Sequence, residues 1–118
     1  MSTNCASLTA RFQSACGNVY SRLDLDADGQ PCRLHVTLGK AGGCAYAHLE
    51  ALSELATELL IEATDPTESL ERIMIALDGI KCHKSNDAAM VKSCHEVAAV
   101  AIAELLENVK PLETNPAP

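Results

Sequence analysis

Apolar and polar side chains alternate along the first third of the chain, and the rest follows a helical period instead. Alternation with a period of two is typical of strands in a sheet with one buried face. It occurs in three runs, whose apolar positions are Leu8, Ala10 and Phe12, then Val19, Leu23 and Leu25, then Cys32, Leu34, Val36 and Leu38. Asp28-Gly29 lies between the second and third runs and favours a tight turn. The sequence therefore predicts a three-stranded antiparallel meander.

The helical part divides into three segments. The first is predicted from about Gly43 to Ala63, where apolar residues recur at helical spacing. The second begins at Asp65-Pro66-Thr67-Glu68, because Asp65 can cap the helix and proline suits its first position. Gly79 then predicts its end.

Ser93-Cys94-His95-Glu96 has the form of a capping box and predicts a third, alanine-rich helix that runs to about Val109. A sheet with one apolar face and three amphipathic helices favour a two-layer α+β domain, with the helices packed on one face. We expect this single domain to span residues 1–110. Prolines at 111, 116 and 118 predict a disordered tail over residues 111–118.

Composition narrows the classes of function. The 118 residues include 16 acidic and 9 basic side chains, a net charge of −7, which disfavours general DNA or RNA binding. Aromatic residues make up 3%, too few for a single-strand stacking platform. No apolar run is long enough to span a membrane and no secretory signal is visible, so we expect a cytoplasmic protein. The alanine-rich helix permits close packing between subunits, and we expect a homo-oligomer.

A glycine-rich segment with one lysine connects the third strand to the first helix. It consists of Gly39, Lys40, Ala41, Gly42 and Gly43. Backbone N–H groups at a helix start attract phosphate, glycine permits close approach, and lysine adds a full charge. The segment lacks the pattern of a Walker P-loop. It predicts an anion-binding site, and the alternative is an ordinary strand-to-helix turn with an exposed lysine.

Three polar residues of the strands are candidates for the same ligand. Arg22 or Arg33 would add a second positive charge from the sheet, and His35 lies on the polar side of its strand. Exposed polar side chains are also ordinary on a strand.

Four of the six cysteines are candidates for a zinc site: Cys16, Cys44, Cys82 and Cys94. Four thiolates can hold zinc in a tetrahedron, but no pair has the C-x-x-C spacing. The alternative is that they are small buried residues with inert thiols. A third hypothesis is a reactive thiol at Cys94, because the dipole at a helix start lowers a thiol pKa. No Ser-His-Asp set, carboxylate pair or dinucleotide fingerprint emerges, so we expect no enzyme.

The order of four landmarks resembles the TSCPD domain over about Thr9 to Glu107. These landmarks are Cys16-Gly17, Gly39-Lys40-Ala41-Gly42-Gly43, Gly79-Ile80-Lys81-Cys82 and Ser93-Cys94. The motif that names the domain appears here as Lys92-Ser93-Cys94-His95-Glu96, in which Ser93 and Cys94 match, and His83 stands where a proline is expected. This domain occurs near the C-terminus of some adenosylcobalamin-dependent ribonucleotide reductases and in small stand-alone proteins. The resemblance implies the α+β fold and a link to nucleotide metabolism.

Together these observations predict a non-catalytic protein that binds or sequesters a nucleotide or a nucleotide-derived anionic signal. The alternative is a zinc-binding accessory module that works by protein contact, with a ribonucleotide reductase as one candidate partner.

Overall fold

The computed structural model describes residues 6–39, 43–82 and 84–113, which form three strands followed by three helices. The elements are β1 (Ala6–Ser14), β2 (Gly17–Leu25), β3 (Pro31–Leu38), α1 (Gly43–Glu62), α2 (Pro66–Leu77) and α3 (Cys94–Glu113). The predicted α+β class and the order of its elements are confirmed.

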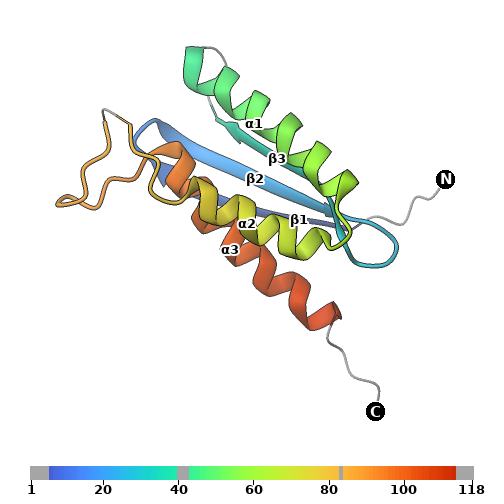
Figure 1. The fold of residues 1–118 in the computed structure, drawn as a ribbon. Coiled ribbons are helices and arrows are strands. Elements are labelled where there is room, and N and C mark those ends of the chain that lie inside the picture. Colours follow the sequence, from blue (N-terminus) through green and yellow to red (C-terminus); the bar gives the residue numbers. More distant parts are fainter. Residues whose placement is uncertain (1–5, 40–42, 83, 114–118) are drawn as a thin grey trace.

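The strands form one antiparallel sheet in the order β1-β2-β3 (Figure 1). In the second hairpin the Asp26 N–H donates to the Gln30 carbonyl at 2.9 Å, and Gly29 adopts a positive φ of 81°. A side chain at this φ would be strained, which explains the Asp-Gly dipeptide that the sequence offers here. The meander is therefore confirmed together with its tight turn.

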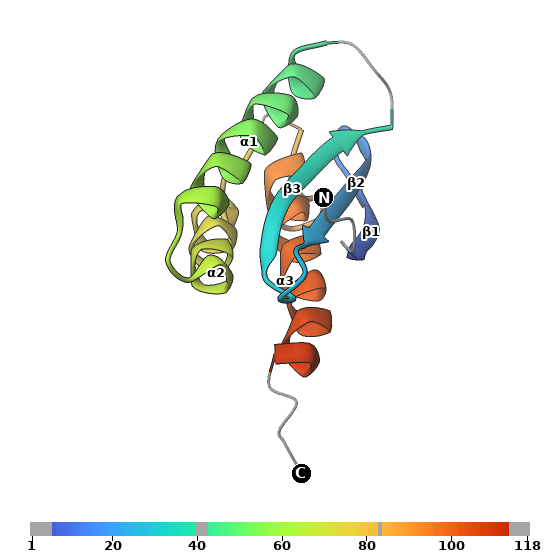
Figure 2. The same cartoon turned by 90° about the vertical axis from the view of Figure 1, so that its right-hand side faces the viewer.

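All three helices cover the same face of the sheet and leave the other face open. α1 lies along β3, α3 packs mainly on β1 and β2, and α2 packs on α3 and α1 (Figures 1 and 2). The apolar positions of β2 and β3 point into this core, as their alternation predicts. Its most completely buried large side chains include Val19, Leu23, Leu25, Leu34, Val36, Leu49, Leu70, Ile102, Leu105 and Val109.

The predicted helix starts are confirmed by their hydrogen bonds. The Asp65 carboxylate accepts from the Glu68 N–H at 3.1 Å at the start of α2. At the start of α3, the Ser93 hydroxyl accepts from the Glu96 N–H at 3.1 Å, and the Glu96 carboxylate accepts from the Ser93 N–H at 3.0 Å. This reciprocal pair is a complete capping box.

The third helix is longer than the sequence predicts. Its backbone stays helical through Pro111 to Glu113, so residues 111–113 are helical rather than part of a tail, and residues 114–118 lie outside the described residues. A proline in the last turn removes one backbone hydrogen bond without ending the helix there. Ala98, Ala99 and Ala101 are buried inside the domain, so the close packing that they permit is made within the chain.

Two hydroxyl groups of α1 close the outer edge of β3. The Ser53 hydroxyl accepts from the Val36 N–H at 2.8 Å and lies 3.1 Å from the Val36 carbonyl. One helical turn later, the Thr57 hydroxyl makes the same pair of contacts with the N–H and carbonyl of Leu34, both at 3.1 Å. Edge strands expose unpaired N–H and carbonyl groups that can pair with other chains. α1 therefore covers the β3 edge as well as packing on the sheet.

Candidate functional site

The open face of the sheet gathers most of the arginines of this acidic chain. The chain has four arginines, and Arg11, Arg22 and Arg33 each lie in a different strand. All three are exposed and alternate with the apolar positions of their strands, so they point away from the helices. A chain with a net charge of −7 thus presents a locally basic surface.

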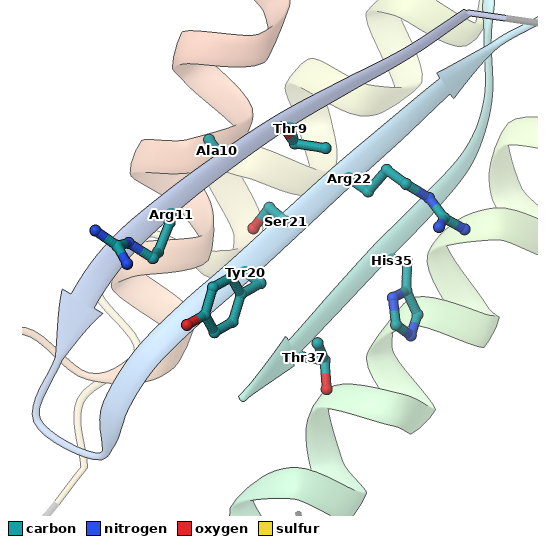
Figure 3. A pocket seen from close by; sticks show the side chains of 8 residues that line it. All are labelled: Thr9, Ala10, Arg11, Tyr20, Ser21, Arg22, His35 and Thr37. Carbon is teal, nitrogen blue, oxygen red and sulfur yellow. The ribbon is translucent and has the colours of Figure 1, made fainter. Parts of the chain in front are cut away.

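A shallow hollow of about 380 Å³ lies on this face (Figure 3). Figure 3 looks onto the sheet with α2 and α3 behind the strands and α1 beside β3. The lining residues come from all three strands and are Thr9, Ala10, Arg11, Tyr20, Ser21, Arg22, His35 and Thr37. Two guanidinium groups, an imidazole, a phenol and two threonine hydroxyls are therefore available to one ligand.

Carboxylates contact two of these side chains while leaving them accessible. Arg22 Nε lies 3.3 Å from Asp24 Oδ1, and the Arg22 side chain remains 47% exposed. His35 Nε2 lies 3.5 Å from Glu50 Oε2 on α1, and the His35 side chain is 35% exposed. Arg11 and Arg33 form no ion pair with any residue that the structure describes. The surface thus keeps positive charge that no described carboxylate neutralises.

The described part of the glycine-rich segment adjoins this hollow. A Cβ atom on Gly39 would lie 3.0 Å from Cε2 of Tyr20, so the ring of Tyr20 packs closely against the chain just after β3. Gly43 begins α1 with a positive φ of 83°, which favours glycine. Lys40, Ala41 and Gly42 lie outside the described residues. The structure therefore describes only the two ends of the predicted anion site, Gly39 and Gly43.

The start of α1 differs in charge from the starts of the other two helices. Glu68 lies in the first turn of α2 and Glu96 in the first turn of α3, whereas the first turn of α1 contains no acidic residue. An acidic side chain in the first turn compensates the positive end of the helix dipole. That end of α1 carries no such compensation.

Three of the four candidate zinc ligands lie close to one another. Cys94 is buried at the start of α3, and burial is the main cause that raises its thiol pKa, followed by the neighbouring thiols of Cys16 and Cys82. The Ala15 N–H donates to the Lys92 carbonyl at 2.8 Å, which brings the turn containing Cys16 to the start of α3. Cys44 is exposed on α1.

Within the part of the chain that the structure describes, no three His, Cys, Asp or Glu side chains are grouped so as to hold a metal ion. His83, which follows Cys82, lies outside that part. The raised pKa of Cys94 also opposes the reactive-thiol hypothesis, because desolvation and the neighbouring thiols outweigh the backbone hydrogen bond that lowers it. Sγ of Cys94 lies 3.8 Å from Nδ1 of His95, whose own pKa is lowered by burial.

The residues after α2 are tied to the start of α3 by a buried carboxylate. Lys81 Nζ lies 2.8 Å from Glu96 Oε2 and 2.7 Å from Asp87 Oδ1. The Lys81 ammonium, and then the Ser93 N–H, lower the pKa of Glu96. The Ser93 hydroxyl donates to the Ile80 carbonyl. The last two landmarks of the sequence, Gly79-Ile80-Lys81-Cys82 and Ser93-Cys94, therefore meet in one polar cluster with a structural role.

Residues 3–108 match the family model of the TSCPD domain. The chain belongs to the TSCPD domain family. The expected resemblance is thus confirmed over most of the chain's length, and the last two of the four landmarks that suggest it hold α3 of this TSCPD domain to the segment after α2. No curated protein and no solved structure gives a match. Among the described helices, none is both long enough and apolar enough to cross a bilayer.

Sequence reasoning finds part of the basic face and misses the rest. Arg22 and His35 are brought together in the hollow, whereas Arg33 lies on the same face but does not line it. Arg11 and Tyr20 line the hollow without having been singled out as ligand-binding residues. The sequence contains a signal for both residues, because Arg11 and Tyr20 lie at polar positions of the alternating pattern in their strands, as Arg22 does.

Proposed function

We propose that this TSCPD domain binds a small anionic ligand, of the nucleotide class, on the open face of its sheet without transforming it. The observation that carries the proposal is the arrangement of Arg11, Arg22 and His35 around one hollow in an otherwise acidic chain. Guanidinium groups pair with phosphate through two parallel hydrogen bonds, and this makes arginine well suited to phosphate recognition.

The hollow also offers contacts for the uncharged part of a nucleotide. The Tyr20 ring is 41% exposed beside it and provides a flat apolar surface for a base. The hydroxyls of Thr9 and Thr37 can donate to or accept from a sugar or a base. A nucleotide has an anionic phosphate, which suits the arginines of this face, and an aromatic base, which suits the Tyr20 ring.

The glycine-rich segment is the second part of the proposed site. Gly39 packs against Tyr20 of the hollow, and the segment leads to the uncompensated positive end of α1. A phosphate held beside Tyr20 would therefore lie near Gly39, the residue that precedes Lys40 in the sequence. In this proposal Lys40 supplies a further counter-charge, as the sequence predicts.

The proposal assigns binding without chemistry to this site. Arginine, tyrosine and threonine side chains can bind and orient a ligand through hydrogen bonds and stacking. A domain of this kind acts by sequestering a nucleotide signal or by sensing it.

The test is calorimetric titration of the purified protein with ADP, and with adenosine as the matched ligand without phosphate. We expect binding of ADP that Arg11→Gln and Arg22→Gln each weaken by about tenfold or more, the loss of one charged hydrogen-bonding partner. Arg72→Gln is the matched control, because Arg72 is the fourth arginine and lies exposed on α2, away from the sheet face. Equal binding of adenosine and ADP, or equal loss in all three variants, would refute the proposal.

The second candidate is the zinc-binding accessory module that the sequence predicts, built on Cys16, Cys44, Cys82 and Cys94, of which Cys16 and Cys82 both raise the pKa of Cys94. Native mass spectrometry of the untagged protein distinguishes the two candidates. A mass excess of one zinc per chain that Cys82→Ser removes would support the module, and an excess of several hundred daltons that Arg22→Gln removes would support the nucleotide binder.

A further inference from the structure

The two edge strands of the sheet, β1 and β3, differ in whether their outward backbone groups are hydrogen-bonded. Ser53 and Thr57 bond the outward backbone groups of Val36 and Leu34 in β3, but no hydrogen bond among the described residues reaches the outer edge of β1. This open edge is nine residues long. It contains no proline, and the described sheet has no irregularity between β1 and β2. Long regular edges without such protection pair with other strands.

The pairing pattern shows which groups of β1 face outward. The Gly39 N–H donates to the Asn18 carbonyl, so Asn18 directs its backbone groups toward β3. Backbone direction alternates along a strand, so Val19 and Ser21 direct theirs toward β1, where they pair with Phe12 and Ala10. The β1 residues that alternate with these direct their N–H and carbonyl groups away from the sheet, and they are Ser7, Thr9, Arg11 and Gln13.

We infer that two copies of this chain join through their β1 strands, antiparallel and in a register centred on Ala10, to form one continuous six-stranded sheet. This register places each outward residue opposite an outward residue of the second copy, Thr9 opposite Arg11 and Ser7 opposite Gln13. About eight backbone hydrogen bonds then form across the two strands. A register centred on either neighbouring residue leaves two residues at each end of the interface without partners.

Side chains on the helix side of β1 fit the same register. Leu8, Ala10 and Phe12 are half-buried there, at the margin of the core. Pairing about Ala10 sets Leu8 of one copy against Phe12 of the other, while two small alanine side chains meet at the symmetry axis. The apolar layer of each copy thus continues into its neighbour, as it does between strands of one sheet.

An apolar hollow beside Phe12 provides room for the incoming leucine. It has a volume of about 230 Å³ and lies between β1, the segment before α3 and α3 itself. Its lining includes Met90 and Val100, which are 81% and 40% exposed. A stable interface buries about 1,200–2,000 Å², more than one pair of strand edges supplies. This adjoining apolar surface contributes the additional area.

Charge favours this edge over the acidic parts of the surface as the place where a second copy binds. The chain carries a net charge of −7, so most approaches between two copies bring acidic surfaces together. β1 contains no acidic residue, and Arg11 is its one charged side chain. In the inferred register Arg11 lies opposite an uncharged threonine.

The first test compares Thr9→Pro with Thr9→Val by light scattering after gel filtration. Proline at position 9 removes the outward N–H of β1 and leaves every N–H that pairs with β2 in place. Edge strands tolerate proline at such a position. Valine at position 9 keeps the outward N–H. Wild type and Thr9→Val are expected at twice the chain mass of 12.5 kDa, and Thr9→Pro at the mass of one chain with an unchanged circular dichroism spectrum. A wild type that stays monomeric from about 1 to 100 µM, or a folded Thr9→Pro dimer, would overturn the inference.

A second test decides the matter if Thr9→Pro does not fold. In the inferred register Ala10 lies opposite its own copy in a pair without hydrogen bonds, where Cβ atoms are about 4.5–5.5 Å apart. Oxidation of Ala10→Cys with diamide is expected to give a covalent dimer joined at the introduced thiols, as identified by peptide mapping. Ala10→Ser is the control for cross-links through the native cysteines. A covalent yield no greater than that of Ala10→Ser would show that the β1 strands do not meet at this position.

Discussion

Substitution of Ser53 by alanine tests how α1 is attached to the sheet. The hydroxyl of Ser53 is the acceptor for the N–H of Val36, a residue that is completely buried. In Ser53→Ala this N–H loses its partner and gains no access to water. A buried donor left without an acceptor costs about 1–3 kcal/mol. Alanine is the better helix former by about 0.5 kcal/mol, so the expected net loss of stability is about 0.5–2.5 kcal/mol.

Ser69→Ala on α2 is the matched control, because it makes the same exchange in a helix while Ser69 has no side-chain hydrogen bond among the described residues. The assay is urea unfolding of both variants, combined with hydrogen exchange of the Val36 amide. Ser53→Ala is expected to be the less stable of the two and to lose protection at Val36. If Ser53→Ala is as stable as Ser69→Ala and Val36 stays protected, the contact does not close the edge.

Three further predictions concern the core, the carboxylate cluster and the thiols. Leu23→Ala removes a completely buried side chain, and calorimetric unfolding should show a loss of about 2–5 kcal/mol. Lys81 lowers the pKa of Glu96 in the folded state. The ionised carboxylate therefore stabilises the fold at pH values above its ordinary pKa of about 4.3. This stabilisation disappears as the pH falls through the lowered pKa. The stability advantage of wild type over Glu96→Gln should therefore be present at pH 7 and vanish in acid; an equal advantage at both ends of the titration would contradict the ion pair. Iodoacetamide at neutral pH should modify exposed Cys44 well before buried Cys94, as followed by mass spectrometry, and faster labelling of Cys94 would revive the reactive-thiol hypothesis.

Local signals in the sequence were sufficient for most of the fold. Alternation identifies the strands, and the residues at Asp28-Gly29, Asp65-Pro66 and Ser93–Glu96 each mark an element boundary through a short-range hydrogen bond or a required φ. The end of α3 is missed because a proline in the last turn costs only one hydrogen bond. The contacts of Ser53 and Thr57 with β3 are also missed, since a polar residue on a helix gives no sign of which strand it will meet.

The candidate site is less accessible to sequence reasoning. The polar parity of Arg11, Arg22 and His35 places all three on one face, but this parity does not say which of them line a common hollow. Similarly, the proximity of Cys16, Cys82 and Cys94 depends on how the first hairpin and the segment after α2 dock at the start of α3. Such proximity arises from tertiary packing, and no spacing along the chain encodes it.

The closed edge of β3 limits how far assembly through strands can proceed. A sheet with two open edges is bivalent, and each added copy presents a new edge, so growth continues into a fibre. With Ser53 and Thr57 bonded to β3, the subunit is monovalent for strand pairing. The inferred association through β1 would use the one open edge of the described sheet, so assembly would stop at two copies. Two hydroxyl groups on α1 thereby protect an apolar, strand-rich segment from open-ended polymerisation.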